Sequence, residues 1–523
     1  MKFDREKRHC LLMAGVLLAG SLLMGCTSTS SALYRGAGEP GCSGVFTTDE
    51  DGIETPNGTG YSCMIATYRL PEAGNEGWLA ENEKRYKLAF LEFDERSLGL
   101  KHQPGKASAQ SQALLAALQS DKQKYVITFV HGWRHDANLQ DNDVRRFRVL
   151  LAYARSFLNW RCQEKRRYCD TEVVGVYIGW RGKSVHEPAN ETIGTALAAP
   201  TFWARKRQSE KHAPFVIEQI DEIQAQLNLD PGNPDADKMM VIGHSFGGNL
   251  LATGLKTRAI NSVIAHKTGT EMTPLLGDLT VLINPASEAH NWIDIQKAMR
   301  SKVAGVSGDI AAIDRTSAWE KEYPQRQRPI YVSLTATDNW AVSETKGKKV
   351  AYDWATGVAF PAGQLAVLRL AEDRRHAIGH VLPRKNYHFG ATHEIVTNDG
   401  SEKNTSYAQS ATRTDTQCVS MDGWLSATRQ RSPSGWDSHY TEHGQNKLTF
   451  VSRTPRVNYQ IRQVLWPEHS RGDISYEPAN SPFWNMRAFS NVIADHGGYV
   501  NYPMWCALNQ MVLDDVTGKP ASQ

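Results

Sequence analysis

The stretch MMVIGHSFGGNLL, Met239 to Leu251, decides the fold. Its first half is a short apolar run typical of a buried strand, and its second half has helix-forming residues. Between them, Ser245 stands in a Gly-x-Ser-x-Gly pattern with Gly243 and Gly247, which would hold its hydroxyl out on a sharp turn. The N-terminus of the following helix would stabilise negative charge there. The pattern predicts a nucleophilic serine; the alternative is a glycine turn whose serine caps the next helix.

Strand-like and helix-like segments alternate on both sides of this stretch. The strand-like segments are 86–94, 125–133, 172–182, 238–245, 279–286, 329–338 and 482–493, and the main helical ones are 108–121, 142–160, 214–229 and 247–267. Short apolar strands alternating with helices predict an α/β fold, a mostly parallel sheet with helices on both faces. Right-handed crossovers then bring the strand C-termini to one edge, where ligands bind.

A serine nucleophile needs a general base, and the expected chain order is serine, acid, histidine. His496 lies in a glycine-flanked loop, SNVIADHGGYV, directly after the last strand-like run, so we predict that it is the base. Asp338 follows the strand-like run YVSLTA and is the predicted acid, with Glu288 in LINPASEA as the alternative. His376 and His380, in RRHAIGH, are interpreted as a solvated helix face rather than a metal site.

Acyl transfer also needs N–H donors for the developing oxyanion. In FVHGW, a bend at His131 and Gly132 would leave the Trp133 N–H pointing inward, and the Phe246 N–H is the second predicted donor. His131 itself is interpreted as a buried structural histidine. Trp133 and Trp180 are candidates either for the pocket wall or for the core.

These residues resemble the α/β-hydrolase superfamily in its serine esterase and lipase branch. The segments FVHGWRHDA, GVYIGWRG, TFWARKR, IGHSFGG, LINPASEA and ATDNWAV together also resemble a group of esterase-like hydrolases of bacteria and fungi. The resemblance spans about Tyr86 to Asn501. It implies an α/β-hydrolase fold with Ser245, Asp338 and His496 as the triad. The long stretch between the acid and the histidine departs from the simple members of the family and is interpreted as an insertion before the catalytic histidine. It also implies hydrolysis of carboxylic esters through an acyl-enzyme, with no metal and no organic cofactor.

Two further interpretations stay open at this point. A lipase, thioesterase or amidase would use the same triad on small-molecule or lipid substrates, and a non-catalytic envelope lipoprotein would use the fold as a binding scaffold. The chain has 59 basic and 56 acidic residues, so its formal charge of +3 gives no reason to expect a nucleic-acid partner.

The N-terminus is typical of a processed export signal. A charged start, MKFDREKRH, precedes an apolar run that ends in LLMGC, and a run this short is more typical of a signal peptide than of a spanning helix. LMGC resembles a bacterial lipobox, which implies cleavage before Cys26 and acylation of that cysteine; the alternative is a plain secretory signal with an incidental cysteine. Thr27 then favours the outer membrane, facing the periplasm or the surface, with the protein held to the membrane by its lipid anchor.

The six remaining cysteines form an even set, which in an oxidising compartment predicts disulfide bonds. Pairing neighbours along the chain predicts Cys42–Cys63, Cys162–Cys169 and Cys418–Cys506, with buried free thiols as the alternative. The expected division of the chain is a signal peptide at 1–25, a tether and irregular segment at 26–84, the hydrolase core at 85–340, an insertion or cap at 341–481, and completion of the core at 482–523.

Overall fold

The computed structural model describes a sheet-forming core and parts of its connections. The described residues are 35, 41–42, 46–48, 54–56, 63–70, 85–95, 108–165, 167–183, 201–230, 233, 235–268, 275–300, 328–336, 353, 355–381, 387–391, 417–418, 445–448, 452–453, 459–464, 481–489, 492–493 and 495–513. Cys26 and Asp338 lie outside them.

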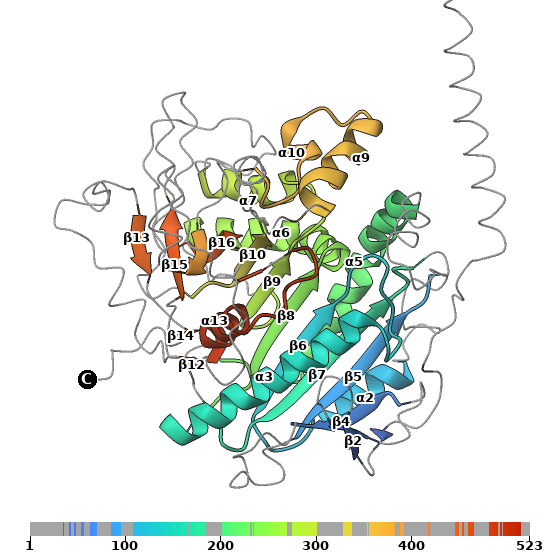
Figure 1. Ribbon diagram of the computed structural model, residues 1–523, viewed down its shortest axis with the longest axis vertical. Helices are drawn as coiled ribbons and strands as arrows, with labels where there is room; N and C mark the ends of the chain where they lie inside the picture. The colour runs from blue at the N-terminus through green and yellow to red at the C-terminus, as the bar shows by residue number, and fades with distance from the viewer. Residues whose placement is uncertain are drawn as a thin grey trace, which may run out of the picture.

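The described strands of the core run parallel in one sheet (Figure 1), in the order β11-β16-β10-β9-β8-β6-β7-β5. They are β5 (Arg85–Phe93), β6 (Lys124–Val130), β7 (Glu172–Trp180), β8 (Lys238–His244), β9 (Leu279–Ile283), β10 (Tyr331–Ala336), β11 (Tyr387–Ala391) and β16 (Phe483–Ala488). The prediction of a mostly parallel α/β sheet is confirmed.

Further strands extend both edges of this sheet. At the β5 edge these are β4 (Ile65–Arg69), β3 (Glu54–Pro56) and β2 (Phe46–Thr48), with β1 (Gly41–Cys42) beside β4; at the β11 edge they are β15 (Tyr459–Val464) and β13 (Gln445–Leu448). β12 (Gln417–Cys418) and β14 (Ser452–Arg453) form a separate pair. Except for β1, these edge strands pair antiparallel with their neighbours, and the sequence patterns did not predict them.

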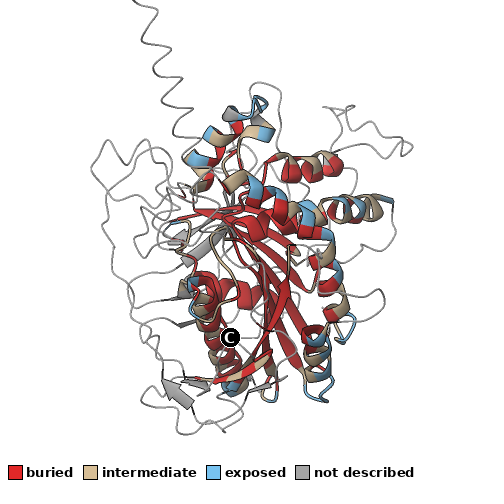
Figure 2. Ribbon diagram, turned by 90° about the vertical axis from the view of Figure 1, so that its right-hand side faces the viewer, coloured by how far each residue is buried: buried red, intermediate tan, exposed pale blue. Residues whose placement is uncertain are grey.

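Helices cover both faces of the sheet, which explains why its central strands are buried along their whole length. Residues of α3 (Asn142–Lys165) and α13 (Tyr502–Leu513) pack on one face. Residues of α2 (Ala109–Ala117), α5 (Phe202–Gln224), α6 (Phe246–Thr268) and α7 (His290–Arg300) pack on the other. Neighbouring strand residues alternate between the two cores: Val126 faces the second and Ile127 the first. Figure 2 shows buried strands between helices with exposed outer surfaces.

The segment 341–481, expected as an insertion or cap, supplies β11, β13 and β15 to the sheet edge. It also contains the π-helical turn η3 (Ala355–Ala359), α9 (Phe360–Ala366) and α10 (Glu372–Arg375), the last two at the top of Figure 1. β16 then returns the chain to the core, where it lies between β10 and β11. The large apolar side chains exposed in the described part of the chain, Leu365, Val367, Leu368 and Leu370, gather at the end of α9.

The disulfide between Cys162 and Cys169, at the end of α3, is present as predicted. Cys63 and Cys506 are also disulfide-bonded. The side chains of their predicted partners, Cys42 and Cys418, lie outside what the structure describes, so those two pairings stay predictions. None of the described helices combines the length and the apolar character that crossing a bilayer requires.

Candidate active site

Ser245 occupies a strained turn between β8 and α6. Its backbone is left-handed, with φ of 54°, a conformation that non-glycine residues rarely adopt outside functional turns. The neighbouring glycines permit this turn. A Cβ on Gly247 would lie 1.9 Å from the Val130 carbonyl oxygen, and one on Gly243 would lie 2.6 Å from the Gly247 carbonyl oxygen. The local sequence therefore forms the sharp strand–turn–helix corner that the Gly-x-Ser-x-Gly pattern predicts.

His496 connects Ser245 to a buried carboxylate. Its Nε2 lies 2.9 Å from Ser245 Oγ, and its Nδ1 lies 2.9 Å from Asp353 Oδ1. The carboxylate can only accept, so Nδ1 carries the proton and the Nε2 lone pair faces the serine hydroxyl. This is the tautomer in which an imidazole accepts a proton from serine. The structure brings the predicted residues Ser245 and His496, which are 251 positions apart in the chain, into direct contact.

Asp353 occupies the position that the sequence analysis assigned to Asp338. Its backbone N–H bonds the carbonyl of Ala336, the last residue of β10, at 3.3 Å, so the carboxylate does come from the end of the predicted strand. Asp338 lies outside the described residues. Among the described residues, the carboxylate that bonds His496 is that of Asp353, which the sequence analysis did not single out. The role predicted for Asp338 stays a prediction.

A short polar chain holds the Asp353 carboxylate. The Thr356 N–H donates to Oδ1 at 3.1 Å, and the Thr356 hydroxyl donates to Oδ2. The same hydroxyl lies 2.8 Å from His380 Nε2. His380 is thus part of the site's surroundings and lies beyond α10, which corrects its interpretation as a solvated helix face. Burial opposes ionisation of Asp353, but His496, His380 and Thr356 outweigh it and hold the pKa of Asp353 below its usual value.

Glu288, the alternative acid, joins α5 to the α9 segment instead. Its Oε2 accepts from Lys206 Nζ at 2.9 Å, and its Oε1 accepts from Gln364 Nε2 at 2.9 Å and from Arg369. Burial acts to raise its pKa, but Lys206 and Gln364 keep the pKa of Glu288 below its usual value. A carboxylate bound to this set of donors does not take the acid's position in the site.

The predicted oxyanion donors flank the turn. Within the described part of the chain, no acceptor bonds the backbone N–H of Trp133 or Phe246. Gly132 brings the Trp133 loop against the nucleophile, since a Cβ at Gly132 would lie 2.8 Å from Ser245 Cβ. The loop is anchored by the next residue, Arg134, whose N–H donates to the Gly182 carbonyl at 3.1 Å. Two free N–H groups next to a serine hydroxyl are suited to bind a developing negative charge.

His131 is a buried structural histidine, as its sequence context predicts. Its Nε2 accepts from the Trp180 backbone N–H at 3.0 Å, and its carbonyl accepts from the Trp180 indole N–H at 2.9 Å. The imidazole stacks on the Trp180 ring at 5.4 Å between centroids, and burial lowers the pKa of His131. Trp180 therefore belongs to the core rather than to a pocket wall.

An aromatic cluster borders the turn on the α5 side. The Trp133 ring contacts Phe202 edge-on at 5.2 Å, and Phe202 lies 4.8 Å from the Phe246 ring. Phe202 also packs near Phe360, which begins α9, at 6.4 Å. Trp133 is thus placed to form an apolar wall beside the nucleophile, contributed jointly by the oxyanion loop, α5 and α9.

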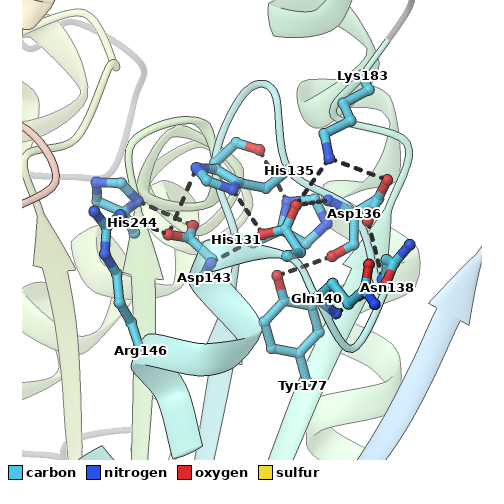
Figure 3. A network of polar contacts seen from close by, with 12 residues as sticks. His131, His135, Asp136, Asn138, Gln140, Asp143, Arg146, Tyr177, Lys183 and His244 are labelled. Carbon is cyan, nitrogen blue, oxygen red and sulfur yellow. Dashed lines mark hydrogen bonds and ion pairs between the residues drawn. The ribbon is translucent and has the colours of Figure 1, made fainter. Parts of the chain in front are cut away.

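A buried charged network lies behind the site and was not predicted from the sequence (Figure 3). Its centre is the fully buried Asp143 near the start of α3. His135 Nδ1 bonds Asp141 at 2.7 Å, and its Nε2 lies 3.5 Å from Asp143, while Lys183 lies 3.1 Å from Asp141. Burial alone would raise the pKa of Asp143, but His135, His244 and Arg146 hold the pKa well below its usual range. Asp143 therefore stays charged next to the site.

Comparisons with known proteins give weak likenesses. No protein-family model matches the sequence, and no curated protein gives a significant match. The siderophore hydrolase EstB from Aspergillus nidulans is 16% identical over 42% of this chain and 59% of its own, with a TM-score of 0.17. An inhibited esterase B from Lactobacillus rhamnosis is 12% identical over 44% of this chain and 61% of its own, also at 0.17. The chain spans less than two thirds of either structure, and likenesses of this size assign no family.

Proposed function

We propose that this protein is a serine hydrolase of the α/β-hydrolase type that cleaves carboxylic esters through an acyl-enzyme. The observation that carries the proposal is the line of hydrogen bonds from Ser245 through His496 to Asp353. The strained turn at Ser245 supports it, as do the N–H groups of Trp133 and Phe246, which no acceptor among the described residues bonds. A binding scaffold would have no need of this combination.

In the proposed reaction, His496 Nε2 accepts the Ser245 proton as Oγ attacks the acyl carbon. The negative charge that develops on the carbonyl oxygen is bound by the N–H groups of Trp133 and Phe246. The imidazolium, stabilised by Asp353, then protonates the leaving alcohol. Water then gives a proton to His496 as its oxygen attacks the acyl carbon. The bond between the acyl carbon and Ser245 Oγ breaks, His496 returns the proton to Oγ, and the carboxylic acid leaves. Thioesters and amides would follow the same steps, and the ester is proposed from the sequence resemblance.

The N-terminal sequence supports a proposal for where in the cell this activity takes place. Cleavage before Cys26 and acylation of that cysteine would tether the folded domain to the outer membrane of a bacterial envelope, facing the periplasm or the surface. Small-molecule or lipid esters in that compartment are the proposed substrates.

Covalent labelling tests the proposed function. The mature chain, treated with a fluorophosphonate probe and digested, should carry one adduct, on the peptide that contains Ser245, and should lose hydrolysis of p-nitrophenyl esters in proportion to labelling. A heat-unfolded sample is the control and should stay unlabelled. Absence of an adduct in the folded protein, or an adduct on another serine, would favour the binding scaffold.

We also predict how kcat/KM depends on pH. Burial lowers the pKa of His496, but Asp353 and then Asp143 outweigh burial and a smaller opposing effect of His135, so the pKa lies above 6.5. Only the neutral imidazole can accept a proton, so activity should be full above the raised pKa and fall as the pH drops through it. A profile from about pH 5 to about pH 9 should place the acidic midpoint above 6.5. A midpoint at or below that value would contradict the electrostatic description.

A further inference from the structure

We propose that His244 and Asn284 are positioning residues that hold the proposed base by its backbone, by clamping the carbonyl oxygen of His496. This inference rests on the proposed function, because it assigns a role relative to His496 as the general base. Neither residue contacts the reacting atoms.

The histidine loop, residues 495–499, needs such a clamp. His496 is followed by Gly497 and Gly498, and glycines leave a backbone many accessible conformations. The imidazole bonds Ser245 and Asp353, but an imidazole on a mobile backbone would sample many positions. A shift of about 1 Å in a catalytic group can lower a rate about 100-fold. The rate therefore depends on what fixes this backbone.

His244 supplies the first half of the clamp. Its Nε2 lies 2.8 Å from the His496 carbonyl oxygen, and because a carbonyl can only accept, Nε2–H is the donor. The His244 ring also packs 5.0 Å from the His496 ring and 4.6 Å from the Tyr499 ring. His244 is the last residue of β8 and precedes Ser245. One rigid strand end thus presents the nucleophile and holds the backbone of the base.

Asn284 supplies the second half from the end of β9. Its Nδ2 donates to the carbonyls of His496 at 2.9 Å and Asp495 at 3.1 Å. Its Oδ1 accepts from the Ala336 N–H at 2.9 Å, which ties the amide to the end of β10. The His496 carbonyl therefore has two donors, one for each lone pair, on neighbouring strands of the sheet.

The buried network steadies the same loop at a second point. The Tyr499 hydroxyl donates to Asp143 Oδ1 at 2.7 Å. Arg146 lies 3.3 Å from the same oxygen and so close to Gly497 that a Cβ there would be 3.1 Å from its Nη1. His244 Nδ1 lies 3.3 Å from Asp143 Oδ2, a contact that becomes a hydrogen bond only when both ring nitrogens carry a proton, and burial lowers the pKa of His244. The clamp is thus built on α3 as well as on β8 and β9.

Paired substitutions at His244 test the inference. His244→Leu removes the donor, whereas His244→Gln keeps an N–H donor at a similar reach. We expect His244→Leu to lower kcat about 100-fold with KM unchanged, and His244→Gln to recover most of that loss. In the His496→Ala background, His244→Leu should have no further effect on kcat, since the group that it positions is gone. His212→Leu, at another buried histidine, on α5, is the matched control and should leave kcat near that of the wild type.

Asn284→Gly is an independent variant that does not depend on the folding of His244→Leu. Asn284 has φ of 44°, which glycine adopts freely, so the change removes the donor without straining the turn. It should also lower kcat at constant KM. Two results would overturn the inference in a protein whose Ser245 the fluorophosphonate probe still labels. One is wild-type kcat in folded His244→Leu and Asn284→Gly. The other is a His244→Gln variant that is as impaired as His244→Leu. A wild type that the probe does not label would instead overturn the proposed function itself, and the inference with it.

Discussion

Ser245→Ala is expected to lower kcat for ester hydrolysis on the order of 10⁶-fold, with the protein still folded. Alanine removes the atom that forms the acyl-enzyme, so no covalent intermediate can form and His496 loses the proton that it is placed to accept. The loss should fall on kcat rather than on KM, because Oγ contributes to the reaction more than to substrate binding. Steady-state kinetics on a p-nitrophenyl ester, with thermal unfolding to show that the fold is intact, measures both.

The matched control for this change is Ser262→Ala. Ser262 is fully buried on α6, the helix that begins directly after the nucleophile, and its side chain has no bonded partner among the described residues. It tests what the loss of a buried hydroxyl does to this helix without touching the site. Activity of Ser245→Ala within tenfold of the control would mean that another group carries out the hydrolysis.

Two members of the candidate site were accessible to sequence reasoning because their signals are local. The turn at Ser245 requires glycines on both sides of it, and a strand, a glycine and a helix follow one another within a few residues. His496 could be chosen among the histidines because it lies in a glycine-flanked loop after the last strand-like run. In both cases a backbone requirement restricts the residue types nearby, and such a restriction is readable without coordinates.

The acid carries no such signal. The sequence placed it at the end of β10, and the structure does so too, through the bond from the Asp353 N–H to the Ala336 carbonyl. The carboxylate, however, comes from further along the chain than the first aspartate after the strand. Any carboxylate that the chain brings back to the strand end can serve as the acid. Which one does so depends on tertiary contacts, such as the hydrogen bonds from Thr356 to Asp353. The place was therefore predictable and the residue was not.

The same distinction applies to the fold and to the clamp. Long apolar runs predicted the parallel core because burial on both faces dictates composition, whereas polar residues interrupt the antiparallel edge strands β13 and β15. His244 contacts Asp143, which is 101 positions away in the chain, and His496, which is 252 positions away. Contacts at that separation follow from packing and leave no periodic pattern.

Asp353→Asn is expected to lower kcat about 10⁴-fold, and Asp338→Asn is expected to have a small effect. Asparagine keeps the shape of the side chain but removes the charge that stabilises the His496 imidazolium. An amide N–H turned toward Nδ1 would also favour the tautomer with its proton on Nε2, which cannot accept from Ser245. Because Asp353 is the main group that raises the pKa of His496, residual activity should show its acidic midpoint at lower pH than the wild type.

Comparing kcat of the Asp353→Asn and Asp338→Asn variants shows by experiment which aspartate is the acid of the site. The two substitutions are chemically identical, and both residues follow β10 in the chain, so a difference in kcat reports contact with His496 rather than a general loss of charge. Glu288→Gln completes the set, since it weakens the ion pairs with Lys206 and Arg369 and should act on stability more than on the pH profile. If Asp338→Asn instead caused the large loss and shifted the acidic midpoint, His496 would have to turn toward that carboxylate during turnover. The hydrogen bond to Asp353 would then describe a resting arrangement.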